Sequence, residues 1–330
     1  MSGRAPAALM REWVMQTGLR ITAFAAGLAA AFGSAYAVGG ALEPADAPKK
    51  PAHQDAHGEK ERPAAGKGEA EDLPGGLAVS RDGFTLDLDT PRVEAGEPAE
   101  LRFSVVDEDT SRKVTAFRRE HGRELHLIVA SGDLATYRHL HPVRAADGTW
   151  SAPVELPEAG GYRVFVDFTP DVRNAEGVTL GADLAAAGDA RPEPLPDTGR
   201  TVTVDGYEVT LDGALRPGAG SEITMEVEKD GKPVTDLQPH LGAYGHLVAL
   251  RAGDLGYLHV HPNGEPGDGR TKSGPGISFT ATAPTKGAYR LFLDFRHEGK
   301  VRTAAFTVHA GGASPEASAP GSGETPGHGH

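Results

Sequence analysis

The sequence predicts an all-β protein made of two tandem immunoglobulin-like β-sandwiches, and three observations support this fold class. An internal repeat of roughly 110 residues per copy fills most of the chain between residues 76 and 310. Each copy consists of short runs that alternate in polarity and are separated by Gly, Pro, Asp or Asn. The 330 residues include 44 Gly and 25 Pro, which favours short strands joined by turns over long helices.

The two copies match in segments that keep their order and spacing. "DGFTLDL" at 82 matches "DGYEVTL" at 205, and "AELRFSV" at 99 matches "SEITMEV" at 221. "LHLIVASGDLATYRHLHP" at 125 matches "GHLVALRAGDLGYLHVHP" at 245, and "GGYRVFVDF" at 160 matches "GAYRLFLDF" at 287. "EGVTLGADL" at 176 matches "EGKVRTAAF" at 298. We therefore expect an immunoglobulin-like domain at 76–187 and a second at 200–310, joined by a Pro-containing linker at 188–199.

Each copy is expected to contain about seven strands, the profile of an immunoglobulin-like sandwich. In the first copy they lie near 84–88, 99–106, 125–131, 134–141, 149–154, 161–168 and 177–184. In the second copy they lie near 203–210, 221–228, 245–251, 255–261, 277–283, 288–296 and 299–308. Tyr162 and Tyr289 each open the sixth strand after a Gly-containing turn, where such sandwiches place a structural tyrosine.

The segments outside the repeat predict export from the cytoplasm. Arg4, Arg11 and Arg20 precede an apolar run and the small residues Ala35 and Ala37, so residues 1–42 form either a cleaved signal peptide or a retained membrane anchor. The preceding positive charges would send the rest of the chain outside. Residues 43–75 predict a disordered stalk and 311–330 a disordered tail, because both lack large apolar residues. We expect an extracytoplasmic protein, anchored by its N-terminal helix or secreted.

Composition excludes several classes of function. The net charge of −13 argues against a nucleic-acid partner, which requires a basic surface. With no cysteine, the chain can form neither disulfides nor thiolate metal sites, and it has no Cys nucleophile. No G-x-S-x-G, H-E-x-x-H, P-loop or dinucleotide fingerprint is present, so we expect a non-enzymatic protein. Metal-dependent hydrolysis ranks last among the interpretations, since three histidines and a water also form a catalytic arrangement.

The motif "YRHLHP" at 137 returns as "YLHVHP" at 257, and it carries the main functional hypothesis. Side chains alternate between the two faces of a strand, so residues two apart share a face at a separation of about 6.5–7 Å. His139 and His141 therefore point the same way, as do His259 and His261. Two imidazoles at this spacing can reach one metal ion.

The preceding strand supplies a third histidine in each copy. A two-residue loop at Gly132–Asp133 pairs Ser131 with Leu134, which places His126 opposite His139 on the same face. In the second copy, a loop at 252–253 places His246 opposite His259, and a loop at 253–254 places it opposite His261. The predicted trios are His126, His139 and His141 in the first repeat, and His246, His259 and His261 in the second.

Three imidazoles suit a divalent transition metal such as Cu or Zn. Asp167 and Asp294, at the end of the sixth strand, are expected either to ligate or to accept a hydrogen bond from a liganding imidazole. His121 and His240 lie in the loop before each hairpin and are more distant candidates. The leading hypothesis is one ion per repeat, for metal buffering, delivery or sensing.

Two other interpretations of the histidines remain open. In the first, they are structural and the chain is a cell-surface interaction or adhesion module with an envelope protein as its partner. In the second, they form a pH-sensitive surface, because the pKa of imidazole lies near neutrality.

The repeated "HLIVASGDLATYRHLHP…GGYRVFVDF" and "GHLVALRAGDLGYLHVHP…GAYRLFLDF" resemble a family of uncharacterised secreted or membrane-anchored proteins of high-GC Gram-positive bacteria. The resemblance covers roughly residues 76–310. More loosely, each repeat is similar to the extracytoplasmic YtkA-like and CopC-like sandwich domains. That similarity implies a role in handling copper or heavy metals. The chain lacks the Met-rich and N-terminal His features of CopC-like sites, so no ligand is carried over from them.

Overall fold

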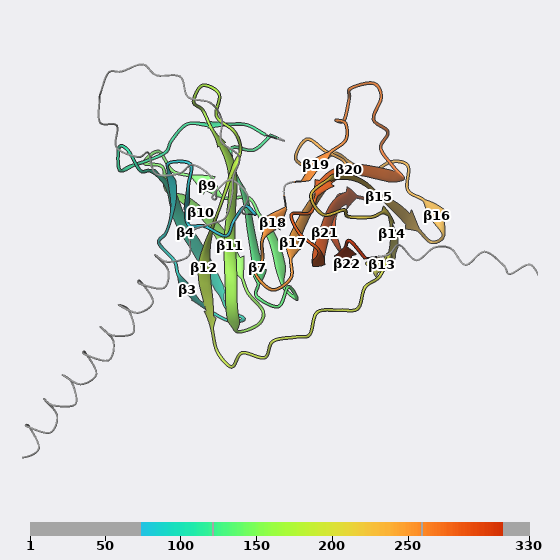
Figure 1. Ribbon diagram of the computed structural model, residues 1–330, viewed down its shortest axis with the longest axis horizontal. Coiled ribbons are helices and arrows are strands. Elements are labelled where there is room, and N and C mark those ends of the chain that lie inside the picture. Colours follow the sequence, from blue (N-terminus) through green and yellow to red (C-terminus); the bar gives the residue numbers. More distant parts are fainter. Residues whose placement is uncertain (1–73, 121, 259, 313–330) are drawn as a thin grey trace, which may run out of the picture. The chain divides into compact units, whose positions relative to one another are not determined.

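The computed structural model describes residues 74–120, 122–258 and 260–312, and these form two β-sandwiches (Figure 1). The predictions for the signal or anchor, for the tail from residue 313 and for all but the end of the stalk lie outside the described residues. So do His121 and His259. Within the described residues, no helix is long and apolar enough to cross a membrane.

The first repeat contains two six-stranded sheets. One has the order β1-β2-β4-β10-β9, with β5 paired to β4; its strands are β1 (Ser80–Arg81), β2 (Phe84–Leu88), β4 (Pro98–Asp107), β5 (Arg112–Lys113), β9 (Val143–Arg144) and β10 (Trp150–Glu155). The other has the order β3-β12-β11-β7-β8, with β6 paired to β11; its strands are β3 (Arg92–Glu94), β6 (Phe117–Arg118), β7 (His126–Ser131), β8 (Tyr137–Leu140), β11 (Gly160–Pro170) and β12 (Val178–Ala187).

The second repeat has the same plan. One sheet has the order β13-β14-β15-β20-β19, with β16 paired to β15; its strands are β13 (Thr201–Val204), β14 (Tyr207–Gly213), β15 (Gly220–Lys229), β16 (Lys232–Pro233), β19 (Val260–Pro262) and β20 (Gly276–Thr282). The other is the four-stranded sheet β18-β17-β21-β22, with β17 (Gly245–Arg251), β18 (Tyr257–Leu258), β21 (Gly287–His297) and β22 (Lys300–Ala310). The predicted fold class, two tandem immunoglobulin-like sandwiches, is confirmed.

Each sandwich has its own apolar core, because inward-facing residues alternate along the strands. Leu101, Phe103 and Trp150 are buried in the first core. Tyr207, Phe279 and Phe306 occupy the second. Burial of such side chains is the main favourable term in folding.

Both predicted structural tyrosines are confirmed. Tyr162 donates a hydrogen bond from its hydroxyl to the carbonyl of Glu158 at 2.8 Å, and Tyr289 does the same to Thr285 at 2.8 Å. Each bond reaches four residues back across the turn before the strand, as in the tyrosine corner of immunoglobulin-like sandwiches.

A third apolar cluster joins the two repeats. Its buried members come from the outer faces of β7, β8 and β11 in the first repeat and of β17 and β21 in the second, with two loop leucines: Ile128, Ala130, Leu134, Tyr137, Phe165, Val248, Leu250, Leu255 and Phe292. The contacts are reciprocal, as in a two-fold dimer, since Tyr137 stacks on Phe292 at 4.2 Å while its counterpart Tyr257 lies 5.7 Å from Phe165. We call the sheets that carry this cluster, the one containing β7 and the one containing β17, the inner sheets, and the other two the outer sheets. The central inner strands β7, β11, β17 and β21 are buried on both faces over most of their length.

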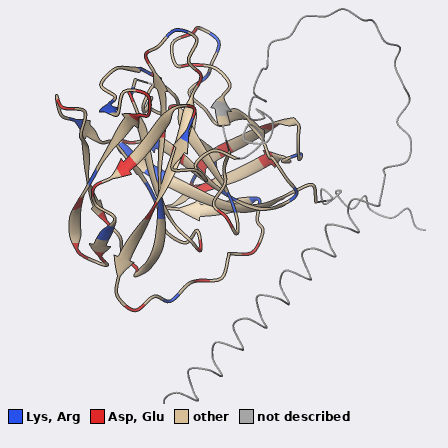
Figure 2. Ribbon diagram, turned by 60° about the vertical axis from the view of Figure 1, so that its left-hand side comes forward, with Lys and Arg blue, Asp and Glu red and all other residues tan. Residues whose placement is uncertain are grey.

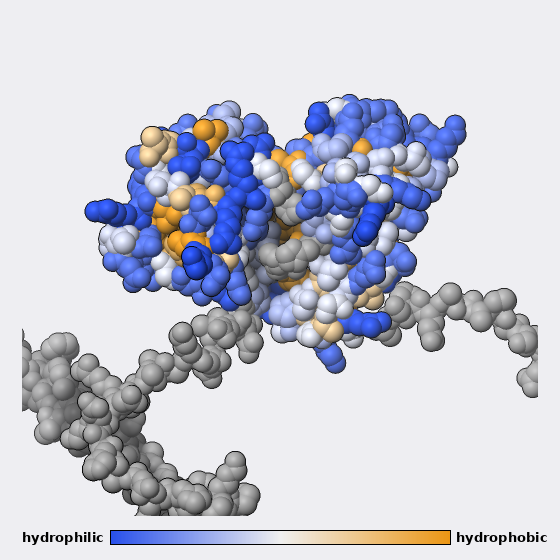
Figure 3. Space-filling view, turned by 90° about the horizontal axis from the view of Figure 1, so that it is seen from above, coloured by the Kyte–Doolittle hydropathy of each residue, from blue (hydrophilic) through white to orange (hydrophobic). Residues whose placement is uncertain are grey.

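Charged residues of both signs are spread over the part of the chain that the structure describes. Lys and Arg are interspersed with Asp and Glu along the ribbon (Figure 2). Hydrophilic residues cover most of the face seen in Figure 3. Among the described residues, the exposed large apolar side chains are four separate valines, at positions 79, 143, 172 and 301.

Candidate functional site

The histidines of the first hairpin lie on the sheet face that points away from the first core and towards the second repeat. Along β7, Leu127 and Val129 point into the first core, which leaves His126 and Ile128 on the opposite face. Across the strand pair, Ile128 is the partner of His139. His126 and His139 therefore share one face, as the sequence indicated.

The predicted register of this hairpin is wrong by two residues. The loop is longer than two residues, since the amide of Ser131 donates to the carbonyl of Thr136 at 2.9 Å. Inside it, Asp133 accepts hydrogen bonds from the Ser131 hydroxyl at 2.5 Å and the Ala135 amide at 3.1 Å, while Leu134 takes a φ of 61°. A shift of two residues keeps every side chain on its original face, so the histidine cluster survives the error.

The rings of the first trio are close together. His126 Nδ1 lies 3.3 Å from His139 Nε2, and the ring centroids of His139 and His141 are 5.2 Å apart. Beyond Leu140 the chain leaves the inner sheet, because Val143 pairs with Ser151 in the outer sheet. His141 therefore lies at the crossing between the two sheets.

The second hairpin follows one of the two predicted registers. Leu250 pairs with Tyr257 and Ala249 with Leu258, which is the alignment produced by a loop at 253–254. The chain then changes sheet, as in the first repeat, since β19 pairs with β20. Of the second trio, the structure describes the side chain of His246; His259 and the side chain of His261 lie outside the described residues.

The histidines of both repeats converge on one place instead of forming two separated groups. The ring of His246 lies 6.0 Å from His126 and 5.9 Å from His139, measured between centroids. His240 lies 5.7 Å from His141 and 6.1 Å from His246. The described histidine side chains of the two repeats therefore share one location, because the hairpin faces pack against each other.

Asp294 links the repeats. Its carboxylate is buried and accepts a hydrogen bond at 2.9 Å from Nδ1 of His139, which belongs to the other repeat. The Tyr137 hydroxyl donates to it at 3.4 Å, and Thr303 Oγ1 donates at 2.5 Å. Asp294 thus accepts a hydrogen bond from an imidazole of the other repeat, a pairing that the sequence did not indicate.

Asp167 holds the equivalent place in the first repeat. It pairs with His126 across β11 and β7 and accepts a hydrogen bond from Thr179 Oγ1 at 2.7 Å. Together with His126, His139 and His246, it lines a cavity of ≈ 70 Å³ between the repeats. Such a volume has room for an ion and one or two waters, since a water takes about 30 Å³ of liquid.

Burial favours the neutral form of His141 and His240. Burial lowers the pKa of His141 to about 4, with a further contribution from the neighbouring His139. Burial also lowers the pKa of His240. A neutral imidazole is the form that binds a metal ion.

Hydrogen bonds select which ring nitrogens can act as ligands. His246 Nε2 donates to the carbonyl of His240 at 2.8 Å, which leaves Nδ1 of His246 with the lone pair. His139 uses Nδ1 to donate to Asp294, which leaves its Nε2 lone pair directed at His126. His126 Nδ1–H donates to this lone pair. Among the described residues, no group of three or more His, Asp or Glu side chains has an arrangement that could hold a metal ion.

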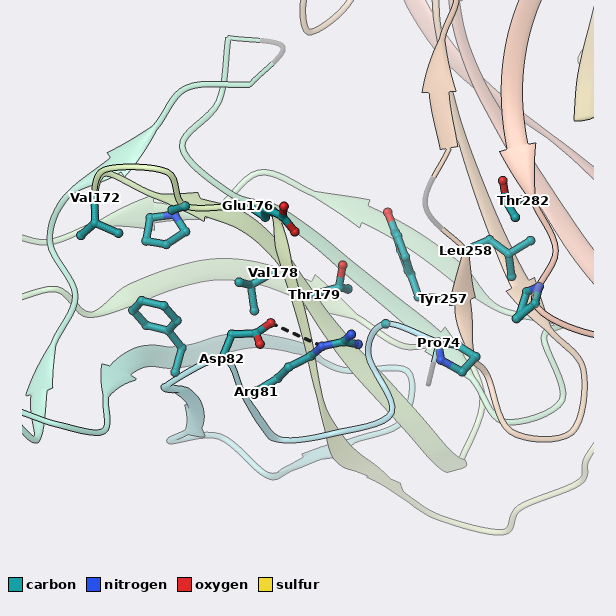
Figure 4. Close-up of a pocket in the computed structure, with 16 residues that line it drawn as sticks. Pro74, Arg81, Asp82, Val172, Glu176, Val178, Thr179, Tyr257, Leu258 and Thr282 are labelled. Atoms are coloured by element: carbon teal, nitrogen blue, oxygen red, sulfur yellow. Dashed lines mark ion pairs between the residues drawn. The ribbon is translucent and has the colours of Figure 1, made fainter. Parts of the chain in front are cut away.

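A larger cavity, of ≈ 730 Å³, contains none of the predicted site residues (Figure 4). Glu176 and Thr179 of the first repeat and Tyr257 and Thr282 of the second line it. Arg81 also lines it and is paired with Asp82 at 3.4 Å. The charged side chains of the lining are thus one cation, Arg81, and two carboxylates, Asp82 and Glu176.

A comparison with models of protein families assigns the chain to a family. The model of a domain of unknown function, DUF8832, matches twice, at residues 78–178 and 202–312. The chain belongs to the DUF8832 family. The double match follows the internal repeat and lends no support to the looser resemblance to YtkA-like and CopC-like domains. No curated protein matches the sequence.

Several solved structures are similar to this DUF8832 protein at low identity. FdeC, an adhesin of Escherichia coli, is 17% identical, and the match covers 71% of this chain and 66% of FdeC with a TM-score of 0.22. InvD of Yersinia pseudotuberculosis is 16% identical, with 72% and 62% covered and a TM-score of 0.22. A membrane anchored protein of Corynebacterium diphtheriae is 8% identical, with 71% and 60% covered and a TM-score of 0.21. In all three cases the match spans less than two thirds of the other chain, and scores this far below 0.5 do not establish a shared arrangement.

Proposed function

We propose that this DUF8832 protein is a non-enzymatic, extracytoplasmic protein that binds a divalent transition metal ion, Cu or Zn, in the cavity between its repeats. The observation that supports this most is the 3.3 Å separation of His126 Nδ1 and His139 Nε2. Two nitrogens bound to one tetrahedral ion lie roughly 3.3 Å apart, because each metal–nitrogen bond is about 2.0–2.1 Å. The two imidazoles therefore already have the spacing of ligands to one ion.

The hydrogen bond from His139 to Asp294 supports the same role. A carboxylate that accepts the remaining N–H of a liganding histidine sets its tautomer and orientation and makes the ligand nitrogen more basic. Asp294 is buried and within 2.9 Å of His139 Nδ1, so it meets both the geometric and the electrostatic requirement. A metal ion bound here would supply charge and stereochemistry, and the chain's residues would hold and orient it.

Further ligands are available nearby. His246 and Asp167 line the same cavity, and His141 lies beside His139. His259 and His261 remain proposed ligands of the second hairpin. We therefore propose one centre that the two repeats share, built on the described histidines.

Calorimetric titration of the metal-free protein with Zn(II) and with Cu(II) tests the proposal. We expect saturable binding, and we expect His139→Ala to weaken it at least tenfold. His309→Ala is the matched control, because His309 is exposed on β22 and lines a different cavity. Asp294→Asn should weaken binding by about 10- to 100-fold, the usual effect of removing such a partner. Absence of saturable binding, or equal affinity in the His139 and His309 variants, would refute the metal proposal.

A cell-surface interaction module with structural histidines is the second candidate. It is favoured by the cross-repeat bond from His139 to Asp294 and by the stacking of Tyr137 on Phe292, since these contacts hold the repeats together without any ion. Capture of an envelope protein by the immobilised protein, unchanged by a chelator and by His126→Ala, would favour this candidate. Turnover of an ester or phosphate substrate would contradict both candidates, because each treats the protein as non-enzymatic.

A further inference from the structure

The segment at residues 74–78, which we call the latch, lies against both repeats. It begins with the last two residues of the predicted stalk and ends two residues before β1, the first strand of the first sandwich. Pro74 and Gly75 line the ≈ 730 Å³ cavity together with Thr179 of the first repeat and Tyr257 of the second (Figure 4).

The first repeat holds the latch through the outer edge of β12. Gly76 donates its amide to the carbonyl of Thr179 at 2.9 Å, and Gly181 donates to the carbonyl of Ala78 at 2.9 Å. The guanidinium of Arg163 adds a bond from Nε to the Gly76 carbonyl at 2.6 Å and one from Nη2 to the Leu77 carbonyl at 2.8 Å. Four hydrogen bonds therefore tie this short segment to the first sandwich.

The second repeat binds the opposite side of the latch. Tyr257 donates its backbone amide to the carbonyl of Gly75 at 3.0 Å, and the two residues form an isolated β-bridge. Pro74 packs so closely on Gly256 that a Cβ added to Gly256 would lie 3.0 Å from Pro74 Cβ. The latch is thus a strand-like bridge between β12 of one sandwich and β18 of the other.

Two glycines make the space for this bridge. Gly76 has a φ of +71°, and a Cβ at this position would overlap the ring of Phe165. A Cβ at Gly181 would overlap the carbonyl oxygen of Gly76, although Gly181 itself has an ordinary strand conformation. The constraint on Gly181 therefore comes from the latch and not from its own backbone.

The second repeat supplies an internal control for this argument. Asp167 pairs with Thr179, and Asp294 pairs with Thr303, so the residue equivalent to Gly181 in β22 is Ala305. The structural alignment is shifted by two residues from the sequence match of 176 with 298. Alanine is accepted at this strand position where no latch is present, so a glycine is required only where the latch binds.

We propose that the latch holds the two repeats in the docked arrangement that brings their histidines around one cavity. The expected effect on ion binding rests on the proposed function, whereas the docking of the two repeats by the latch does not. If the ion contacts both repeats, linkage requires that it favours the docked state, and that loss of the latch weakens its binding. The latch residues thus act as positioning residues for a site that they do not touch.

Distance measurement in a labelled protein tests the latch. The chain has no cysteine, so the pair Asp109→Cys and Lys232→Cys, at exposed positions in the two repeats, accepts spin labels at defined places. We expect one narrow distance distribution by double electron–electron resonance in the otherwise unchanged protein. Gly181→Ala should broaden it and shift it to longer distances, and Arg163→Gln should do the same without adding any atom near the latch.

Gly161→Ala is the matched control, because an added Cβ there meets nothing within 4 Å and the position lies on the neighbouring strand β11. It should leave the distribution unchanged. Circular dichroism checks that each variant retains its strands. If Gly181→Ala and Arg163→Gln both keep the narrow distribution, the latch proposal is wrong.

The same samples separate this proposal from the metal proposal. With Zn(II) added, the Gly181→Ala distribution should narrow again, and its zinc affinity should be about tenfold weaker than that of the unchanged protein, a change of about 1.4 kcal/mol. If the unchanged protein binds no zinc, the proposed function fails while the distances still decide the role of the latch. If zinc binds with equal affinity to protein with broadened distances, the link between latch and ion is refuted.

Discussion

Removing the carboxylate of Asp294 should destabilise both repeats, although the residue belongs to only one of them. The carboxylate is 3% exposed and accepts hydrogen bonds from His139 at 2.9 Å and from Thr303 at 2.5 Å. In Asp294→Ala the buried Nδ1–H of His139 loses its acceptor, which costs about 1–3 kcal/mol, whereas Thr303 is exposed and its hydroxyl can bond to water instead. We expect the free energy of unfolding to fall by about 1–3 kcal/mol.

A double-mutant cycle isolates the part of this energy that crosses between repeats. The variants are His139→Ala, Asp294→Ala and the combination, each unfolded in urea and followed by far-ultraviolet circular dichroism and by the fluorescence of Trp150, which is buried in the first core. A hydrogen bond to a charged group contributes about 1.5–3 kcal/mol, so we expect a coupling energy in that range. Asp212→Ala, at an exposed position of the same repeat, should change stability by less than about 0.5 kcal/mol. A coupling energy below about 0.5 kcal/mol would show that His139 and Asp294 act independently, and the cross-repeat argument would then fail.

Two other predictions follow from bonds and pKa values already described. Tyr162→Phe and Tyr289→Phe should each lower the free energy of unfolding by about 1 kcal/mol, because each removes one hydrogen bond to a backbone carbonyl; chemical denaturation measures the loss, and an unchanged midpoint would contradict it. The metal-free protein should lose stability as the pH falls from about 6.5 towards 4, because burial lowers the pKa of folded His141 to about 4 and the unfolded chain then binds the proton first. Urea midpoints at several pH values test this, and His141→Gln should flatten the dependence; an equally steep dependence in that variant would assign it to other groups.

Much of the fold could be predicted because local patterns determine it. The predicted strand at 84–88 coincides with β2, and that at 245–251 coincides with β17. Alternating polarity placed His126 and His139 on one face, and the structure does the same, since the period of two is insensitive to an even shift in register. The loop at Gly132 was predicted too short because the Asp133 side chain, by binding Ser131 and the Ala135 amide, stabilises a longer turn.

The site could not be predicted in full, because its form depends on how two sandwiches pack. Strand patterns state which face of a sheet is apolar, but not which surface covers that face. One signal was nevertheless available: "HLIVAS" and "GHLVALR" read as continuous apolar runs instead of alternating ones, and such runs are typical of strands buried on both faces. This pattern indicates that something covers the outer face of each hairpin, and the structure shows that the other repeat does.

The reciprocal packing of the repeats leads to a last prediction, about a single repeat on its own. In the isolated segment 76–187, Ile128, Tyr137 and Phe165 would lose their cover from the second repeat and form an exposed apolar face. Because the two hairpin faces pack on each other through equivalent residues, this face is complementary to a copy of itself. We expect the isolated segment to form dimers in sedimentation velocity at micromolar concentration, and Phe165→Lys to return it to a monomer. A well-folded, soluble monomer without that substitution would mean that the apolar cluster contributes little to docking, and the shared histidine cavity would then depend on the latch and the bond from His139 to Asp294.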